Sequence, residues 1–507
     1  MNESASKSSN WSSLFVQIQD SVIAGQHQHS RALFDQIIPR QIPREWAYRF
    51  AQLANRIHQS IFSLKAMHRF IFPENLLVET TATDEEKMIY GYALLNLGAV
   101  DESLQILTTI NSQANPEALF IRSMANFRKW NYADSLPLLK QYISNTQLDP
   151  YRRLVGEVNL VAASICLFKC DKVPALIENI QLTCKEKDYK LLLGNSYELQ
   201  AQYYFFQERY DDAIHCLNQA AELLRDQQGL YLLFVEKWSL LCACFKANTK
   251  ENLQKLQDLR HKAKLLGEWE TIRECDLFEA ILTENEMLLK KVIMGTPSEL
   301  YRHRARQLFK KDIKPQGHIF WEIQNVKNAT VTDFNPYEKR NGQTALFEKP
   351  HLLALFEALT LDFYKPAHLG ALFKSVYPTE KFNPFTSPAR VMRLLKRLDD
   401  WFLSQQVALR VEFKKSEFHL VASSPVRILI QRGQKLTSRS GRWTEIKSSL
   451  QGRTFTSSKI SEVTGISIAS AQRLIKSAVN EGLLTVRGKG PNTAYQFSLR
   501  KKLGKAA

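Results

Sequence analysis

Hydrophobic residues recur at intervals of three and four from Trp11 to about Leu289, and no strand-like alternation persists in that part of the chain. This spacing gathers apolar side chains on one face of an α-helix, so the region is predicted to be helical almost throughout. Proline and glycine fall mainly between the helical segments, where they favour turns. After about residue 316 the pattern changes to short alternating runs mixed with helical stretches, which indicates a different architecture.

A weak internal repeat runs through the helical part. The segment around Tyr210 is its clearest copy, because Ala201 supplies a small residue where two helices must approach closely. The pattern resembles the tetratricopeptide repeat (TPR), a pair of helices in about 34 residues. The resemblance implies a helical-repeat domain over residues 11–294 that binds a protein or peptide partner, and a generic helical array is the alternative. The equivalent positions are spaced by 32, 40 and 38 residues, at Val100, Tyr132, Lys172 and Tyr210.

The segments that flank the repeats are polar or basic. Residues 1–10 are predicted to be a disordered tail, and they lack the apolar stretch of a secretory signal. Residues 295–315 are predicted to form a basic helix and linker. Because no apolar run approaches the roughly 20 residues of a membrane helix, no membrane contact is expected and the protein is predicted to be cytoplasmic. The seven cysteines lack the spacing of zinc ligands and are interpreted as core thiols.

Residues 316–422 combine short strand patterns, three helices and a final hairpin. The third helix is predicted to begin at Ser387 and Pro388, a favourable cap and first-turn pair. Its basic side carries Arg390, Arg393, Lys396 and Arg397. The opposite side is an apolar stripe that should face the core, formed by Val391, Leu394, Leu395, Leu398 and Phe402.

This order of elements predicts a winged helix, and it resembles the effector domain of OmpR-type response regulators, whose best match is VMRLLKRL at 391–398. In that family the third helix enters the major groove of DNA. Leu395 stands where the family usually has a basic residue, which puts a base contact there in doubt. A solvated charged face is the alternative interpretation. The resemblance implies DNA contacts from the third helix and the hairpin, through Arg390, Arg393, Lys396, Arg397, Lys414 and Lys415.

Residues 440–500 resemble bacterial winged helix-turn-helix regulators, with a turn at Gly465 and a glycine-rich wing. The third helix is predicted to bury Ile468, Ala471 and Ile475. Glutamine and arginine can read adenine and guanine edges, whereas lysine more often meets phosphate. A winged helix that binds proteins is the alternative. The predicted DNA contacts are Ser470, Gln472, Arg473 and Lys476 on the helix, with Arg487 and Lys489 on the wing.

The remaining C-terminal segments are short and basic. Residues 423–439 are predicted to be a linker, and the sequence leaves open whether RILIQ within it is a strand or a helix. Residues 501–507 are predicted to be a basic tail.

The charge is divided unevenly along the chain. Residues 1–300 contain 32 Lys and Arg against 36 Asp and Glu, a net charge of −4. Residues 301–507 contain 36 against 15, a net charge of +21. Concentrated positive charge disfavours the compact state and is typical of proteins that bind a polyanion, so double-stranded DNA is the expected partner of the C-terminal part.

The sequence predicts a mainly α fold, in which a TPR-like helical array is followed by two small α+β winged-helix domains. It contains no phosphate-binding loop, dinucleotide fingerprint or nucleophile elbow, so neither an enzyme nor a cofactor nor a metal site is expected. The predicted function is a DNA-binding transcriptional regulator, associated with the nucleoid, whose array binds a protein or peptide. The alternative is a TPR-based scaffold whose winged helices mediate protein–protein contacts.

Overall fold

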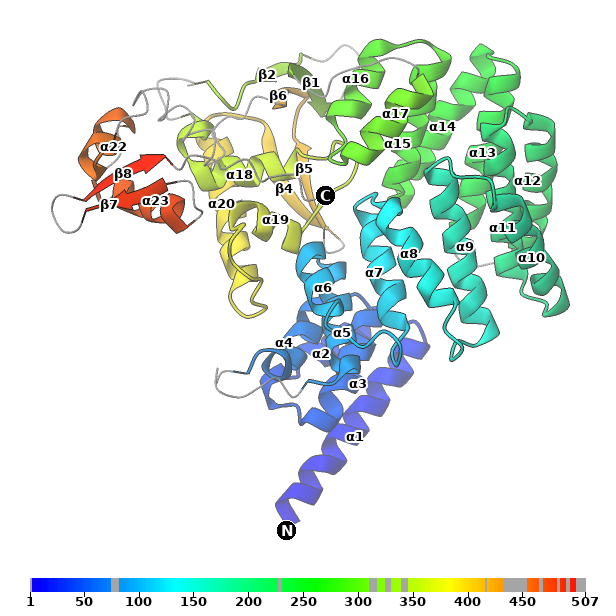
Figure 1. Ribbon diagram of the computed structural model, residues 1–507, viewed down its shortest axis with the longest axis horizontal. Helices are drawn as coiled ribbons and strands as arrows, with labels where there is room; N and C mark the ends of the chain where they lie inside the picture. Colours follow the sequence, from blue (N-terminus) through cyan, green and yellow to red (C-terminus); the bar gives the residue numbers. More distant parts are fainter. Residues whose placement is uncertain are drawn as a thin grey trace. The chain divides into compact units, whose positions relative to one another are not determined.

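The chain is mainly α: an array of helices is followed by two small α+β domains (Figure 1). It divides into two compact units, Met1–Ile430 and Gln431–Ala507, which are described separately. The computed structural model describes residues 2–73, 82–226, 230–309, 317–323, 330–338, 345–414, 417–432, 454–464, 468–480, 484–488 and 493–497.

The array occupies the N-terminal part of the first unit, and each of its helices packs mainly on its neighbours in sequence. From α5 onward the helices form successive pairs. Its elements are α1 (Asn2–Ile23), α2 (His27–Asp35), η1 (Pro39–Gln41), α3 (Arg44–Arg56), α4 (Ser60–Ile71), α5 (Asp84–Asn96), α6 (Val100–Leu107), α7 (Glu117–Arg128), α8 (Tyr132–Ile143), α9 (Pro150–Cys166), α10 (Val173–Glu186), α11 (Lys190–Phe206), α12 (Tyr210–Leu224), α13 (Tyr231–Lys246), α14 (Lys250–Leu266), α15 (Trp269–Leu282) and α16 (Glu286–Met294). A further helix, α17 (Glu299–Phe309), follows the array.

The same turn joins the two helices of several pairs, which confirms the TPR-like repeat. The residue at the turn has a left-handed backbone, with φ of 80° at Gly98, 59° at Trp130 and 62° at Glu208. The next amide donates to the carbonyl five residues back, as in a Schellman cap; Asn131 N to Asn126 O, at 2.9 Å, is one example. The four predicted equivalent positions mark where the second helix starts, because α6, α8 and α12 begin at Val100, Tyr132 and Tyr210, and Lys172 directly precedes α10.

Helix α1 includes residues 2–10, which the sequence analysis predicted to be a disordered tail. The helix is anchored further along by Trp11, whose ring lies 6.0 Å from that of Phe50 in an edge-on contact. Once such a turn is fixed, each added residue gains a hydrogen bond at little extra entropic cost, so the helix propagates toward the N-terminus.

The thiols of the array are free, and five of the seven are buried. Burial raises the pKa of Cys216 to about 11 and that of Cys275 to about 12, which keeps both protonated. These cysteines therefore act as small core residues, as the sequence predicted. Among the helices that the structure describes, none combines the length and apolar character needed to cross a lipid bilayer.

The first α+β domain completes the first unit. Its described strands form two three-stranded sheets, β1-β6-β2 with β2 and β6 parallel, and β3-β5-β4 with antiparallel pairs. The elements are β1 (Gly317–Ile323), β2 (Thr332–Phe334), η2 (Leu346–Glu348), α18 (Pro350–Leu359), β3 (Ala367–His368), α19 (Leu369–Val376), α20 (Ser387–Ser404), β4 (Leu409–Lys414), β5 (Glu417–Ala422) and β6 (Val426–Arg432).

Strand β6 lies where the sequence analysis placed a linker and left RILIQ undecided. Val426, Ile428 and Ile430 alternate into the core, and Val426 pairs with Thr332 of β2. The alternation is that of a strand, but its partner lies almost a hundred residues earlier, so short-range patterns do not reveal the pairing. The linker can therefore start only after Arg432.

The second α+β domain contains α22 (Ser457–Thr464), α23 (Ile468–Asn480), β7 (Leu484–Arg487) and β8 (Ala494–Phe497). Ala471 and Ile475 are buried as predicted, whereas Ile468 is 51% exposed. Ile468 is the first residue of α23 and lies beyond the edge of the small core, which explains the wrong prediction. The predicted turn at Gly465 falls outside the described residues, as does the tail 501–507.

Candidate functional site

Helix α20 separates an apolar face from a basic one, as the sequence predicted. All five residues of the predicted stripe are buried, including Leu395, which departs from the OmpR-type pattern. The stripe packs on the other helices of the first α+β domain; the ring of Phe402, for example, lies 6.2 Å from that of Phe356 on α18. Burial of the stripe fixes the rotation of α20 and so determines which residues face water.

Arg393, Lys396 and Arg397 are exposed on the opposite face of α20. Lys396 and Arg397 lie three and four residues after Arg393, so both are about one turn from it on the same side of the helix. The structure gives none of the three an ion pair with any residue that it describes. The three cations are thus exposed on one side of α20 and unpaired among the described residues.

Arg390, the fourth predicted contact on this helix, has an intramolecular role. Its Nη2 donates to Glu380 Oε1 at 3.0 Å, and its guanidinium lies 3.8 Å from the centre of the Tyr377 ring. The hydrogen bond from Arg390 holds the pKa of Glu380 below its usual value. Arg390 thus ties α20 to the segment that follows α19.

The hairpin formed by β4 and β5 faces the array. Lys414 lines a groove of about 740 Å³ between this hairpin and the array, and the ring of His419 lies 5.8 Å from that of Trp269 on α15. Lys414, which the sequence predicted to contact DNA, is exposed and lies on the side of the domain that faces the array. Lys415, the neighbouring predicted contact, falls outside the described residues.

Helix α23 of the second α+β domain presents Gln472, Arg473 and Lys476 to solvent, on the face opposite its buried Ala471 and Ile475. Arg487 on β7 is also exposed. The predicted contacts Ser470 and Lys489 fall outside the described side chains. The structure therefore brings three of the predicted residues together on α23 and places Arg487 on the hairpin of the same small domain.

Buried ion pairs join the first α+β domain to the C-terminal end of the array. Arg273 of α15 has no exposed surface, and its Nη2 donates to Asp362 Oδ2 at 2.6 Å in the segment after α18. Two residues further on, the Tyr364 hydroxyl donates to Asp276 Oδ2 at 2.8 Å. Asp276 also accepts hydrogen bonds from two cations of the array at 2.7 Å each, from Lys291 and Arg260.

These cations keep Asp276 ionised. Burial by itself favours the neutral acid, but Lys291 and Arg260 outweigh it and hold the pKa of Asp276 below its ordinary value. The carboxylate therefore accepts the Tyr364 hydrogen bond as an anion, which makes this contact between array and domain a strong one.

The same domain also contacts the N-terminal end of the array. The Gly370 amide at the start of α19 donates to Leu97 O at 2.7 Å, directly after α5. The Phe382 amide donates to Glu102 of α6 at 2.9 Å. One small domain therefore binds both α5–α6 and α15–α16 of the array.

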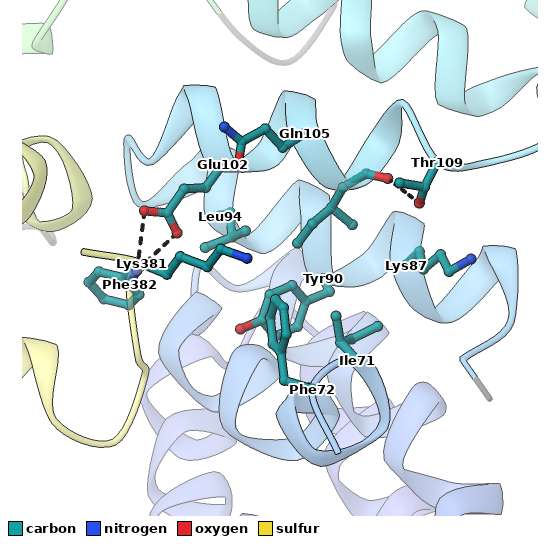
Figure 2. Close-up of a pocket in the computed structure, with 11 residues that line it drawn as sticks. Ile71, Phe72, Lys87, Tyr90, Leu94, Glu102, Gln105, Thr109, Lys381 and Phe382 are labelled. Carbon is teal, nitrogen blue, oxygen red and sulfur yellow. Dashed lines mark hydrogen bonds between the residues drawn. The ribbon is translucent and has the colours of Figure 1, made fainter. Parts of the chain in front are cut away.

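A cavity of about 250 Å³ lies beside this N-terminal contact. Figure 2 shows Glu102 reaching the Phe382 amide and the Lys381 side chain extending over the cavity toward Phe72 and Tyr90. Its apolar walls and two lysines suit a small amphipathic molecule more than a polar one. The lining consists of Ile71, Phe72, Lys87, Tyr90, Leu94, Glu102, Gln105, Ile106, Thr109, Lys381 and Phe382.

The buried polar residues of the contact between array and domain have no recognisable signal in the sequence. Arg273 and Asp276 look like ordinary surface positions of an amphipathic helix, and Asp362 looks like a residue of a polar turn. Their partners lie almost ninety residues away along the chain. No local motif marks them, and only the tertiary structure brings them together.

No protein-family model matches the chain, and no curated protein matches it. Among solved structures, the crystal structure of the apo form of RapI is similar with a TM-score of 0.40 and 8% sequence identity, over 78% of this chain and 99% of that chain. The crystal structure of a Rap protein complexed with competence and sporulation factor gives a TM-score of 0.40 and 11% identity, with the same coverage. Similarity at this level carries no argument about function, so the functional assignment depends on the chain's own surfaces.

Proposed function

We propose that the protein is a non-enzymatic, DNA-binding transcriptional regulator of the bacterial cytoplasm, in which the helical array receives a protein or peptide signal. The observation that carries the proposal is the exposed row Arg393, Lys396 and Arg397 on α20. A helix that keeps three cations uncompensated while its other face is fully buried is suited to the major groove, which is wide enough to admit an α-helix.

Two further observations support this proposal. Gln472 and Arg473 on α23 offer the side-chain types that pair with adenine and guanine edges. The net charge of +21 in residues 301–507 supplies the phosphate contacts that account for most of the affinity for DNA. The array, with a net charge of −4 over residues 1–300, is not expected to contribute to DNA binding.

A specific observation favours the scaffold as the second candidate. In winged-helix regulators the hairpin contributes to the DNA surface, but here the β4–β5 hairpin faces the array, and Lys414 lines the groove between them. A hairpin in that position is suited to protein contacts. The scaffold therefore competes with the DNA-binding proposal for the first α+β domain, and less so for the second.

Replacement of the basic row tests the proposal. We expect Arg393→Gln, Lys396→Gln and Arg397→Gln together to weaken binding of a random 30-base-pair duplex and to reduce the slope of log Kd against log salt by about 2.7, since each neutralised phosphate contributes about 0.9. Fluorescence anisotropy of the full chain at several salt concentrations measures both effects. The matched control removes the same charge from exposed positions of the array, by Lys140→Gln, Lys172→Gln and Lys190→Gln.

The control should bind DNA like the unaltered chain. Equal binding by all three proteins would contradict a DNA contact from α20 and would favour the scaffold for the first α+β domain. A loss of DNA binding in the control alone would contradict the division of roles between the array and the C-terminal part.

A further inference from the structure

Helix α17 lies across the face that the first helices of the pairs form, a surface that we call the first-helix face and that consists of the C-terminal ends of α7, α9 and α11 together with α15. Ser298, just before α17, donates to Lys129 O at 3.5 Å, beside the end of α7. Arg304 lies against Cys166 at the end of α9 and against Phe206 at the end of α11. A single helix of eleven residues thus crosses several repeats, as a bound peptide would.

Apolar and aromatic contacts hold α17 on this face. Tyr301 and Ala305 are 2% and 0% exposed, and both pack with α15. The Tyr301 ring lies 4.6 Å from the Trp130 ring in an edge-on arrangement. The left-handed turn at Trp130 is one of the turns of the repeat, so the position of the Trp130 ring is set by the array itself.

Arg304 is buried on the same face, three residues after Tyr301. Its guanidinium lies 5.5 Å from the Phe168 ring centre and 5.4 Å from that of Phe206, and Nη1 lies 4.0 Å from Cys166 Sγ. Among the described residues, neither Arg304 Nε nor the Tyr301 hydroxyl finds a hydrogen-bond partner. Buried polar groups without partners cost free energy, so α17 binds less tightly than its packing alone would allow.

The first-helix face also carries an ionised carboxylate, Glu274 of α15, that interacts with Arg304. Burial disfavours the Glu274 carboxylate, but Lys237 and Arg304 together hold its pKa below the usual value. Glu274 is also paired with Lys237 of α13, and the buried Arg273 lies 5.5 Å from the Tyr301 ring, so carboxylates and cations alternate beneath α17. The rings of Phe168 and Phe206 form the pocket that receives an arginine on a helix, through cation–π contacts.

We propose that the first-helix face is a docking site for a basic helical segment of a partner protein, with an aromatic residue and an arginine three positions apart, and that α17 occupies this site until the partner displaces it. This inference rests on the proposed role of the array as the receiver of a protein or peptide signal. The partner segment should share the basic charge of α17 and the three-residue spacing of Tyr301 and Arg304, because these are the features of α17 that fit the face.

Displacement changes how the parts of the first unit are connected. Helix α17 is tethered to α16 by four residues, Gly295–Ser298, so its effective concentration at the face reaches the millimolar range or above. A partner in solution must outcompete that tethered helix, and its apparent affinity falls by the fraction of chains in which the face is free. Because α17 precedes β1 in the chain, its release removes a connection between the array and the first α+β domain.

A peptide competition experiment on the full chain tests this. The probe is a fluorescein-labelled peptide with the sequence of residues 296–309, followed by anisotropy. Two chain variants weaken the packing of α17 on the first-helix face and leave the residues of the face unchanged. Tyr301→Ala removes the aromatic side chain that contacts Trp130, and Ala305→Arg places a large side chain at a position with no exposed surface. Both variants should bind the peptide at least about tenfold more tightly than the unaltered chain, because the tethered competitor is lost. Arg56→Ala, at an exposed arginine of α3, is the control and should leave peptide affinity unchanged.

A second readout keeps the test decisive if one variant folds poorly. Excess unlabelled peptide should raise amide hydrogen exchange in residues 299–309 of the unaltered chain, and a peptide carrying Tyr301→Ala should not. Absence of both effects, with equal peptide binding by all chains, would overturn the docking site. The duplex titrations of the α20 variants are independent of this result. If DNA binding fails but the peptide displaces α17, the proposed function alone is refuted. If DNA binding holds but the peptide does not displace α17, the docking site alone is refuted.

Discussion

His368 shows how the contact between array and domain controls a single ionisable group. It directly precedes α19 and lies close to Gly98 of the array. A Cβ atom placed on Gly98 would come within 2.8 Å of the His368 Cβ atom. Burial, followed by the charge of Lys365, lowers the pKa of His368 to about 4. Arg128 and His419 act in the same direction and Glu417 opposes them, so the imidazole is neutral in the folded protein at pH 7.

Acidification should therefore destabilise the first unit. An unfolded histidine titrates near pH 6.5 and the folded one near 4, so between these values the unfolded state binds more protons and its free energy falls relative to the folded state. The stability that neutral His368 contributes is present above about pH 6.5 and is lost as the pH falls toward 4, by at most about 1.4 kcal/mol per pH unit. Thermal unfolding between pH 4 and 7 measures the loss.

His368→Gln should flatten that dependence, because glutamine cannot take up the proton. The exposed His215→Gln on α12 is the matched control and should preserve it. An equally steep fall in melting temperature for His368→Gln would assign the acid sensitivity to other groups.

The buried pair Arg273–Asp362 makes a second prediction at the residue scale. Among the ion pairs that the structure describes, Asp362→Ala leaves the fully buried Arg273 with the one to Glu270, at 3.3 Å. A buried charge that loses its partner costs about 3 kcal/mol or more. Chemical denaturation followed by circular dichroism should show that loss for Asp362→Ala. The exposed Asp400→Ala on α20 is the control, and an equal effect of the two substitutions would show that Arg273 does not depend on Asp362.

At the scale of elements, α23 and α20 make different predictions about DNA. Arginine can give guanine two parallel hydrogen bonds worth about 1–3 kcal/mol of discrimination, whereas a lysine on phosphate carries little sequence information. We therefore expect Arg473→Ala to weaken binding to a selected preferred duplex more than to a random one. Lys476→Ala should weaken both about equally. Titrations of the two duplexes measure the ratio, and an unchanged ratio in Arg473→Ala would move base recognition to α20.

Elements with strong local patterns could be predicted from the sequence. The stripe of α20 is decided by residues three and four apart, so its buried face and its exposed Arg393, Lys396 and Arg397 followed directly. Strand β6 could not be assigned, because its partners β1 and β2 are distant in sequence. Arg390 and Lys414 were predicted as DNA contacts from their position on the elements, but their surroundings depend on Glu380 and on the array, which no local pattern encodes.

At the scale of the molecule, the charge of each part matches the role proposed for it. The array carries −4 over residues 1–300, and its first-helix face accepts the basic helix α17. The C-terminal part carries +21 over residues 301–507, with exposed cations on α20 and α23. Sequence composition alone revealed this division, because net charge does not depend on the tertiary structure. It did not reveal that the basic segment beginning near residue 299 docks within the array, since burial of Arg304 depends on Cys166, Phe168 and Phe206.

The attachment of one small domain to both α5–α6 and α15–α16 has a mechanical consequence. In arrays of stacked repeats, each repeat usually contacts only its neighbours, so distant repeats are not directly connected. Here the contacts at Leu97 and at Asp276 tie together two repeats that lie far apart in sequence. We therefore expect strain applied at one of these repeats to be shared by the other, so that the stretch from α5 to α16 resists extension more than an open solenoid of the same length.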